Sequence, residues 1–245
     1  MTFDREKFES EKSQYISNMY HDVDLKKTSL DFTRKSYEYN YCYLWTWLGI
    51  PIIQMPEDVL FAQEIIWQNK PDVIIETGIA WGGSVVCYAS ILSLYHKHGK
   101  MIAIDRVLPQ KNIDAIQDYS FKDSIYLLEG DSTDKALFQR VQNLIKPNDK
   151  VMLILDSNHT HDHVLAELEL WSSLVTRGQF IIVADTIVEE IPEHKDRPRP
   201  WGKGNNPKTA VCAFLEKNKN FSDDNTYNKR SLISCNRDGY LERLS

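Results

Sequence analysis

The chain has 245 residues, enough for one α/β domain of ordinary size with a short appended segment. Hydrophobic residues make up 42% of it and charged residues 26%, a balance typical of a soluble globular protein. The formal net charge of −6 argues against nucleic acid as the main partner, because phosphate binding needs a basic face. No apolar run approaches the length of about 20 residues that a membrane span needs. The charged first residues and four widely spaced cysteines favour a cytoplasmic protein with reduced thiols.

Residues 1–56 are predicted to form an N-terminal helical and aromatic extension, and residues 57–245 the main domain. Apolar residues recur near helical spacing from Asp4 to Tyr20, which predicts a helix with one apolar face. Residues 37–47 include six Tyr and Trp side chains. We expect these to pack against the main domain or a second subunit, and contact with an acceptor stays open as the alternative. A homo-oligomer is therefore expected.

Apolar strands alternate with helices from residue 72 onward. Strands are expected at 72–76, 101–105, 124–129, 150–156 and 179–184, and helices at 56–69, 82–96, 112–117, 134–145, 161–176 and 208–219. This alternation predicts an α/β fold whose parallel sheet is covered on both faces. Two short strands at 231–235 and 239–243 predict an antiparallel hairpin at the C-terminus, which makes a mostly parallel seven-stranded sheet.

Acidic residues and glycines occupy the ends of the first three strands. Glu76 ends the first, and Gly78 and Gly82 follow in a Glu-x-Gly-x-x-x-Gly spacing that differs from the dinucleotide pattern Gly-x-Gly-x-x-Gly. Asp105 ends the second, where a carboxylate can accept hydrogen bonds from ribose hydroxyls. Asp131 and Ser132 follow the third, where they either contact adenine or cap the next helix. Together these positions predict a nucleoside-binding site.

The ends of the fourth and fifth strands carry candidate metal ligands. Asp156 and Asp185 are expected to converge on one hard cation such as Mg²⁺, with helix capping as the alternative. His159 is the candidate general base. His161 and His163 are expected in the first turn of the following helix, where surface or packing roles are more common than catalysis. The loop at 191–207, rich in proline and charge, is expected to act as a lid.

Several motifs occur in a consistent order along the chain: Glu76–Ser84, Leu155–His159, His163–Leu168, Val183–Thr186, and Arg199–Gly202 followed by Asn206–Ala210. On these motifs, residues 50–245 resemble the cephalosporin hydroxylase / rhamnosyl O-methyltransferase family. The resemblance implies a Rossmann-like class I methyltransferase fold that binds S-adenosylmethionine and Mg²⁺ (or Mn²⁺). It implies cofactor contacts from Glu76, Gly78, Ala80, Trp81, Gly82, Ser84, Asp105, Arg106, Asp131, Ser132, Asp156 and Asn158.

The resemblance also implies a site similar to that of catechol-type O-methyltransferases. Asp156 and Asp185 fall on metal-ligand positions, and Thr186 stands where the catechol enzymes have an amide ligand. Ala184 stands where some relatives carry a glutamate, and His159 falls on the general-base position. The implied acceptor is a hydroxyl of a sugar, glycan or secondary metabolite, including a phosphorylated one. Weaker acceptor-contact predictions are His161, His194, Arg197, Arg199 and Trp201, whose arginines suit an anionic group.

Three other functions stay open. A nicotinamide-dependent oxidoreductase would use a similar sheet, although the glycine spacing argues against it. An iron-dependent hydroxylase would require a His-x-Asp or His-x-Glu pair of iron ligands, and the segment 159–163 lacks such a pair. A non-catalytic partner that keeps the cofactor fold is compatible with Ala184 and Thr186.

Overall fold

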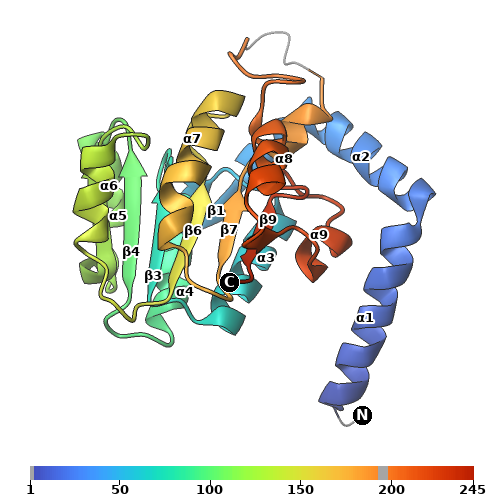
Figure 1. Cartoon of the computed structure of the whole chain (residues 1–245), viewed down its shortest axis with the longest axis horizontal. Helices are drawn as coiled ribbons and strands as arrows, with labels where there is room; N and C mark the ends of the chain where they lie inside the picture. Colours follow the sequence, from blue (N-terminus) through green and yellow to red (C-terminus); the bar gives the residue numbers. More distant parts are fainter. Residues whose placement is uncertain (1–2, 193–197) are drawn as a thin grey trace.

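A central sheet of seven strands organises the chain (Figure 1). The computed structural model describes residues 3–192 and 198–245. The strand order is β5-β4-β3-β6-β7-β9-β8, in which the first five strands are parallel and β9 runs antiparallel to both neighbours. The strands are β3 (Val73–Thr77), β4 (Lys100–Asp105), β5 (Ile125–Glu129), β6 (Val151–Leu155), β7 (Phe180–Val183), β8 (Phe221–Ser222) and β9 (Tyr240–Arg243). The predicted mostly parallel, seven-stranded α/β fold is confirmed.

The direction in which strands are added reverses at β3. Its neighbours are β4 on one side and β6 on the other, with Thr77 paired to Ile104 and to Leu155. In open α/β sheets, ligands bind at such a reversal, outside the carboxyl ends of the strands. The segments that follow Thr77, Asp105 and Leu155 therefore meet at one edge of the sheet.

Helices cover both faces of the sheet. One face is packed by α3 (Pro56–Asn69), α4 (Gly83–Ser93), α5 (Gln110–Ile116) and α9 (Thr226–Arg230), and the other by α6 (Lys135–Gln142), α7 (His161–Trp171) and α8 (Pro207–Lys217). The helix predicted over 161–176 ends at Trp171 and continues as a 3-10 turn over Ser172–Leu174. Among the described residues, no helix combines the length and apolarity that a bilayer crossing requires.

The N-terminal segment contains two helices and a small antiparallel pair of strands. These are α1 (Arg5–His21), α2 (Val23–Tyr37), β1 (Trp45–Trp47) and β2 (Ile50–Ile52), with a 3-10 turn at Tyr41–Tyr43. Helix α1 packs against α9 and extends beyond the sheet (Figure 1). Phe8 and Tyr15 on this helix are exposed. The domain boundary at residue 56 and the homo-oligomer stay predictions.

The predicted C-terminal hairpin is wrong in one of its strands. Residues 231–235 form no strand, and β9 instead pairs with β7 and β8. The amides of Leu232 and Ile233 donate to the Glu57 carboxylate at 2.8 and 3.2 Å, and the Cys235 amide donates to Asp58 at 2.8 Å. Because these carboxylates in the first turn of α3 bind three of the five amides, those donors are not available for a sheet ladder.

Candidate active site

The turn between β3 and α4 brings the main chain of three elements into contact. Gly78 has a φ of +79°, and a Cβ there would stand 2.1 Å from the carbonyl oxygen of Asp156, just after β6. A Cβ on Gly83 would stand 2.2 Å from the carbonyl oxygen of Pro51. Only glycine fits at either position, since any side chain would push the neighbouring backbone away. The turn therefore holds the ends of β3 and β6 close together.

Two carboxylates flank this turn. Glu76 is fully buried, and neither of its carboxylate oxygens has a hydrogen-bond partner in the part of the chain that the structure describes. Burial raises the pKa of Glu76 to about 8. Asp105 accepts the Ile79 amide at 2.9 Å and the Val107 amide at 3.2 Å, which joins the end of β4 to the turn. A buried carboxylate without a partner is costly, so Glu76 is a candidate partner for a cationic ligand group.

Two cavities cross the carboxyl ends of the strands at this point. The larger, of about 300 Å³, is lined by Gly78, Ala80, Trp81, Ser84, Asp105 and Asp156, among others. The smaller, of about 160 Å³, is lined by Gly78, Asp105, Arg106, Asp131, Ser132 and Asn158, among others. Of the residues predicted to contact a cofactor, Glu76 and Gly82 line neither cavity as the structure describes them. A Cβ on Gly82 would meet Ile116 of α5, so this glycine serves packing.

The two residues after β5 that were predicted either to contact adenine or to cap the next helix, Asp131 and Ser132, do not cap α6. Asp131 accepts both the amide of Thr133 at 2.9 Å and its hydroxyl at 2.7 Å, and these contacts hold the pKa of Asp131 below its ordinary value. The cap of α6 is Asp134, which accepts the Ala136 amide at 2.8 Å. The capping alternative for Asp131 and Ser132 is therefore wrong, and both line the smaller cavity.

A buried polar network underlies the smaller cavity. His163 Nε2 lies 3.0 Å from the Ser132 hydroxyl and 3.1 Å from the Ser157 hydroxyl, and Ser157 donates to Glu167 at 2.7 Å. The Glu167 carboxylate raises the pKa of His163 above its ordinary value. The expectation that His163 is a surface or packing residue missed this network. The four-residue spacing of His163 and Glu167, which places both on one face of a helix, could have indicated it.

Asp156, His159 and Asp185 form the one group of three potential metal ligands found among the described His, Cys, Asp and Glu residues. Their ligand atoms lie within 4.8 Å of one another, and His159 Nε2 is 3.3 Å from the Asp185 carboxylate. Burial, and then the neighbouring Asp185 carboxylate, raise the pKa of Asp156 well above its ordinary value. A divalent cation would offset both effects, so the donor set fits one.

The surroundings of Thr186 do not fit its prediction as a metal ligand. Its side chain is fully buried and its hydroxyl donates to the Arg237 carbonyl at 2.6 Å. Asp185 has a φ of +55°, a left-handed conformation that is strained for a residue with a side chain. This conformation places the side chains of Asp185 and Thr186 in different surroundings: Asp185 lines the cavities and Thr186 packs beneath them.

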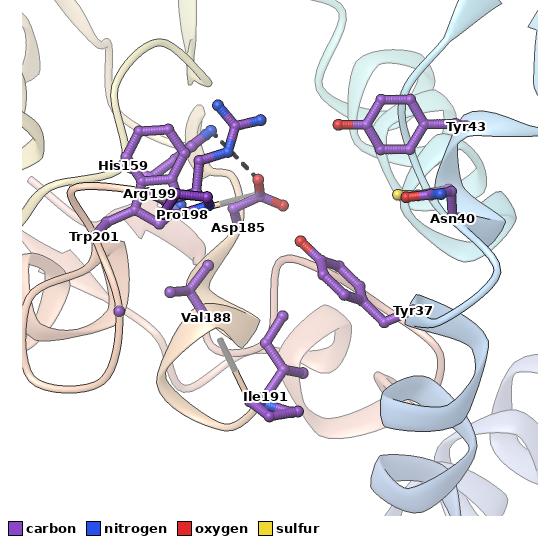
Figure 2. Close-up of a pocket in the computed structure, with 13 residues that line it drawn as sticks. Tyr37, Asn40, Tyr43, His159, Asp185, Val188, Ile191, Pro198, Arg199 and Trp201 are labelled. Carbon is purple, nitrogen blue, oxygen red and sulfur yellow. Dashed lines mark ion pairs between the residues drawn. The ribbon is translucent and has the colours of Figure 1, made fainter. Parts of the chain in front are cut away.

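A third cavity, of about 320 Å³, adjoins the group of potential ligands (Figure 2). Its lining includes His159 and Asp185 on one side, with Trp201 in edge contact with the His159 ring at a centroid distance of 4.8 Å. The Arg199 guanidinium lies 5.1 Å from the Trp201 ring centroid. Arg199 and Trp201 therefore line this cavity and also the larger cavity at the glycine turn, and their contact with an acceptor stays a prediction.

The other predicted acceptor residues do not reach this cavity or are not described. The His161 ring lies 2.8 Å from the Thr209 hydroxyl and its amide donates to Asn205, so His161 is directed at the start of α8 and its prediction is wrong. His194 and Arg197 lie outside the described residues, as does part of the predicted lid. Their roles stay predictions.

The aromatic N-terminal segment divides between two roles. Trp45 and Trp47 pack against the hydrophobic core, as expected. Tyr37 and Tyr43 line both the third cavity and the larger cavity at the glycine turn, which agrees with the alternative that was left open beside packing. Nothing in the sequence distinguishes the two pairs, because all four lie in one aromatic run.

Comparison with known proteins decides the family. The family model "Rhamnosyl O-methyltransferase/CmcI" matches residues 39–244. The chain belongs to this family. The rhamnosyl O-methyltransferase of Mycobacterium leprae (strain TN) is 29% identical over 170 residues, which cover 69% of each chain. That of Mycobacterium tuberculosis (strain ATCC 25618 / H37Rv) is 30% identical over 170 residues, 69% of this chain and 65% of the relative.

Solved structures show the same fold. CmcI with Mg and SAM matches with a TM-score of 0.57 at 19% identity, over 83% of this chain and 78% of that one. An O-methyltransferase from Bacillus cereus in complex with SAH matches with a TM-score of 0.50 at 17% identity, over 85% and 86%. The predicted class I methyltransferase fold is confirmed, and S-adenosylmethionine-dependent O-methyl transfer is confirmed as the activity class of the family. Membership decides against the nicotinamide-dependent and iron-dependent alternatives.

Proposed function

We propose that the protein transfers a methyl group from S-adenosylmethionine to a hydroxyl of a sugar or glycan acceptor, with a divalent cation at Asp156 and Asp185. The observation that carries the proposal is that the larger cavity at the glycine turn and the third cavity adjoin, with His159 and Asp185 among the seven lining residues that they share. A methyl donor in one cavity and an acceptor in the other would meet at these two side chains. The names of the mycobacterial relatives support a rhamnosyl acceptor.

The cavities at the glycine turn suit the parts of the cofactor. Asp105 accepts two amides, and a carboxylate has about four acceptor sites, so it keeps capacity for the ribose hydroxyls. Glu76 does not line the cavity itself but neighbours Ser84, which does, and its buried carboxylate is proposed to stabilise the cationic amino-acid end of the cofactor from behind the cavity wall. The smaller cavity, between Arg106 and the His163 network, is proposed for the adenine.

Oxygen ligands suit Mg²⁺, so Asp156 and Asp185 are proposed to hold the cation and His159 is left to move a proton. A bound cation would lower the pKa of the acceptor hydroxyl and orient it. His159 Nε2 accepts the hydroxyl proton, and the Asp185 carboxylate at 3.3 Å stabilises the charged imidazole. The acceptor oxygen forms a bond to the methyl carbon as the bond from sulfur to that carbon breaks. The products are a methyl ether and S-adenosylhomocysteine, with the proton on His159.

Transfer of tritiated methyl from S-adenosylmethionine to p-nitrophenyl α-L-rhamnopyranoside tests this proposal. Activity is expected with Mg²⁺ and is expected to disappear in EDTA. His159→Gln should lower kcat by about 10²–10⁴, the usual contribution of a general base. The matched control, His98→Gln, changes an exposed histidine outside the three cavities and should leave kcat unchanged. Undiminished activity in EDTA would remove the metal from the mechanism, and near-full activity of His159→Gln would remove the base.

A further inference from the structure

Helix α2 is fixed to the catalytic domain by buried and charged contacts. Arg34 donates from Nε and Nη2 to the Glu190 carbonyl at 3.0 and 2.9 Å, across 156 positions of the sequence. Arg237 donates to the Ser29 hydroxyl at 2.6 Å, and Thr33 is fully buried. Hydrogen bonds from charged groups are among the stronger ones in proteins. The C-terminal end of α2 therefore has a defined position beside the 3-10 turn Thr186–Glu189.

This end of α2 supplies the wall of the third cavity that faces the catalytic group (Figure 2). Tyr37 is the last residue of α2, and its hydroxyl points towards Asp185. Asn40 and Tyr43 follow on the same side, and Asn40 takes the left-handed conformation at a φ of +50°. The family model begins at residue 39, so Tyr37 lies outside the matched region.

The Tyr37 hydroxyl is available for a ligand. It makes no hydrogen bond with the residues that the structure describes, although the side chain is half-buried. A tyrosine hydroxyl carries its proton at neutral pH, so it can donate a hydrogen bond. A ligand hydroxyl that replaces water as the hydrogen-bond partner of Tyr37 gives a modest net gain in binding free energy.

The chemistry of the cavity matches a sugar ring. Its volume of about 320 Å³ lies at the lower end of the range for small-molecule sites, about 300–1,000 Å³. Trp201 and Val188 offer apolar surface to the C–H groups of a ring. Tyr37, Asn40 and Arg199 offer polar groups to its hydroxyls. A neutral pyranose presents this combination, and Arg199 is the one arginine or lysine among the described residues that line the cavity.

We propose that Tyr37 is an acceptor-binding residue whose hydroxyl binds the sugar hydroxyl next to the one that is methylated. This inference rests on the proposed function. Tyr37 stands beside Asp185, so the oxygen it binds must neighbour the oxygen that reacts at His159 and Asp185. The N-terminal segment thus completes the acceptor site and selects a sugar with two adjacent hydroxyls.

The test compares Tyr37→Phe with Tyr39→Phe on p-nitrophenyl α-L-rhamnopyranoside and on its 2-deoxy and 3-deoxy analogues. Tyr39 is a matched control because it lies two positions away, is 69% exposed and does not line the cavity. Tyr37→Phe is expected to lower kcat/KM about tenfold on the rhamnoside, the upper range for one neutral hydrogen bond. It should have no effect on the deoxy analogue that lacks the partner hydroxyl. Tyr39→Phe should behave as wild type on every substrate.

Each outcome bears on one claim. Equal kcat/KM for Tyr37→Phe and wild type on the rhamnoside would overturn the inference, and so would an equal loss on the rhamnoside and on every deoxy analogue that wild type still methylates. Weaker binding of S-adenosylmethionine by Tyr37→Phe, measured by calorimetry, would also overturn it, because the residue would then act on the cofactor. Wild type that binds S-adenosylmethionine without methylating the rhamnoside would overturn the sugar assignment. Wild type that binds no S-adenosylmethionine would instead overturn the proposed function.

Discussion

Replacing Gly78 with alanine tests whether the contact between β3 and β6 shapes the cofactor cavity. The new Cβ would stand 2.1 Å from the Asp156 carbonyl oxygen, at a backbone φ of +79°. The left-handed conformation costs an L-residue about 1–2 kcal/mol, and overpacking adds about 1–3 kcal/mol. Together these predict a loss of about 2–5 kcal/mol in the free energy of unfolding, or roughly 4–20 °C in Tm for a chain of this size.

Gly178→Ala provides the matched control. Gly178 has a similar φ of +76°, but its Cβ would meet nothing within 4 Å. Gly178→Ala should lower the free energy of unfolding only by the cost of the left-handed conformation, about 1–2 kcal/mol, and should leave cofactor affinity unchanged. Gly78→Ala should weaken S-adenosylmethionine binding at least tenfold, about 1.4 kcal/mol, because relief of the contact moves the turn. Differential scanning fluorimetry and calorimetric titration measure both effects. Equal losses in Tm for the two variants, with wild-type cofactor affinity in both, would refute the reasoning.

Two further predictions concern Asp105 and His163. Asp105→Ala should weaken S-adenosylmethionine binding by about 1–3 kcal/mol, because it leaves the Ile79 amide unpaired and removes an acceptor for the ribose hydroxyls. Unchanged affinity in a calorimetric titration would contradict this. Glu167 raises the pKa of His163 in the folded protein above the value of about 6.5 that a histidine has in the unfolded chain. The pair therefore contributes its full share to the free energy of unfolding below a pH of about 6.5, and this contribution is lost as the pH rises through the folded-state pKa. Urea unfolding from pH 6 to 9 should show this loss in wild type and not in His163→Gln, and parallel pH profiles would contradict it.

The sheet and the acidic ends of its strands were predictable because their determinants are local. A strand buried on both faces has a continuous apolar sequence, and a ligand site in a parallel sheet lies just beyond the carboxyl ends. Asp105, Asp156 and Asp185 could therefore be placed from the positions of three apolar runs. Gly78 was predicted for the same reason, although its contact with the Asp156 carbonyl was not.

The errors and omissions depend on contacts between distant parts of the chain. The segment 231–235 has the pattern of a strand, yet carboxylates of α3 bind its amides from about 175 positions away. Tyr37 lines the third cavity at the end of α2, and the contacts of Arg34 with the Glu190 carbonyl that hold this helix in place are not revealed by any local pattern. Thr186 follows Asp185 directly, but the left-handed conformation at Asp185 separates the two side chains.

Calorimetric titration of the purified protein with S-adenosylmethionine, and separately with NAD⁺, tests most directly whether the cavities at the glycine turn form a methyl-donor site. One saturable site is expected for S-adenosylmethionine, weakened by Gly78→Ala and by Asp105→Ala, with no binding of NAD⁺. Absence of S-adenosylmethionine binding, or binding that both variants leave unchanged, would contradict the placement of the cofactor between Glu76, Asp105 and Asp156.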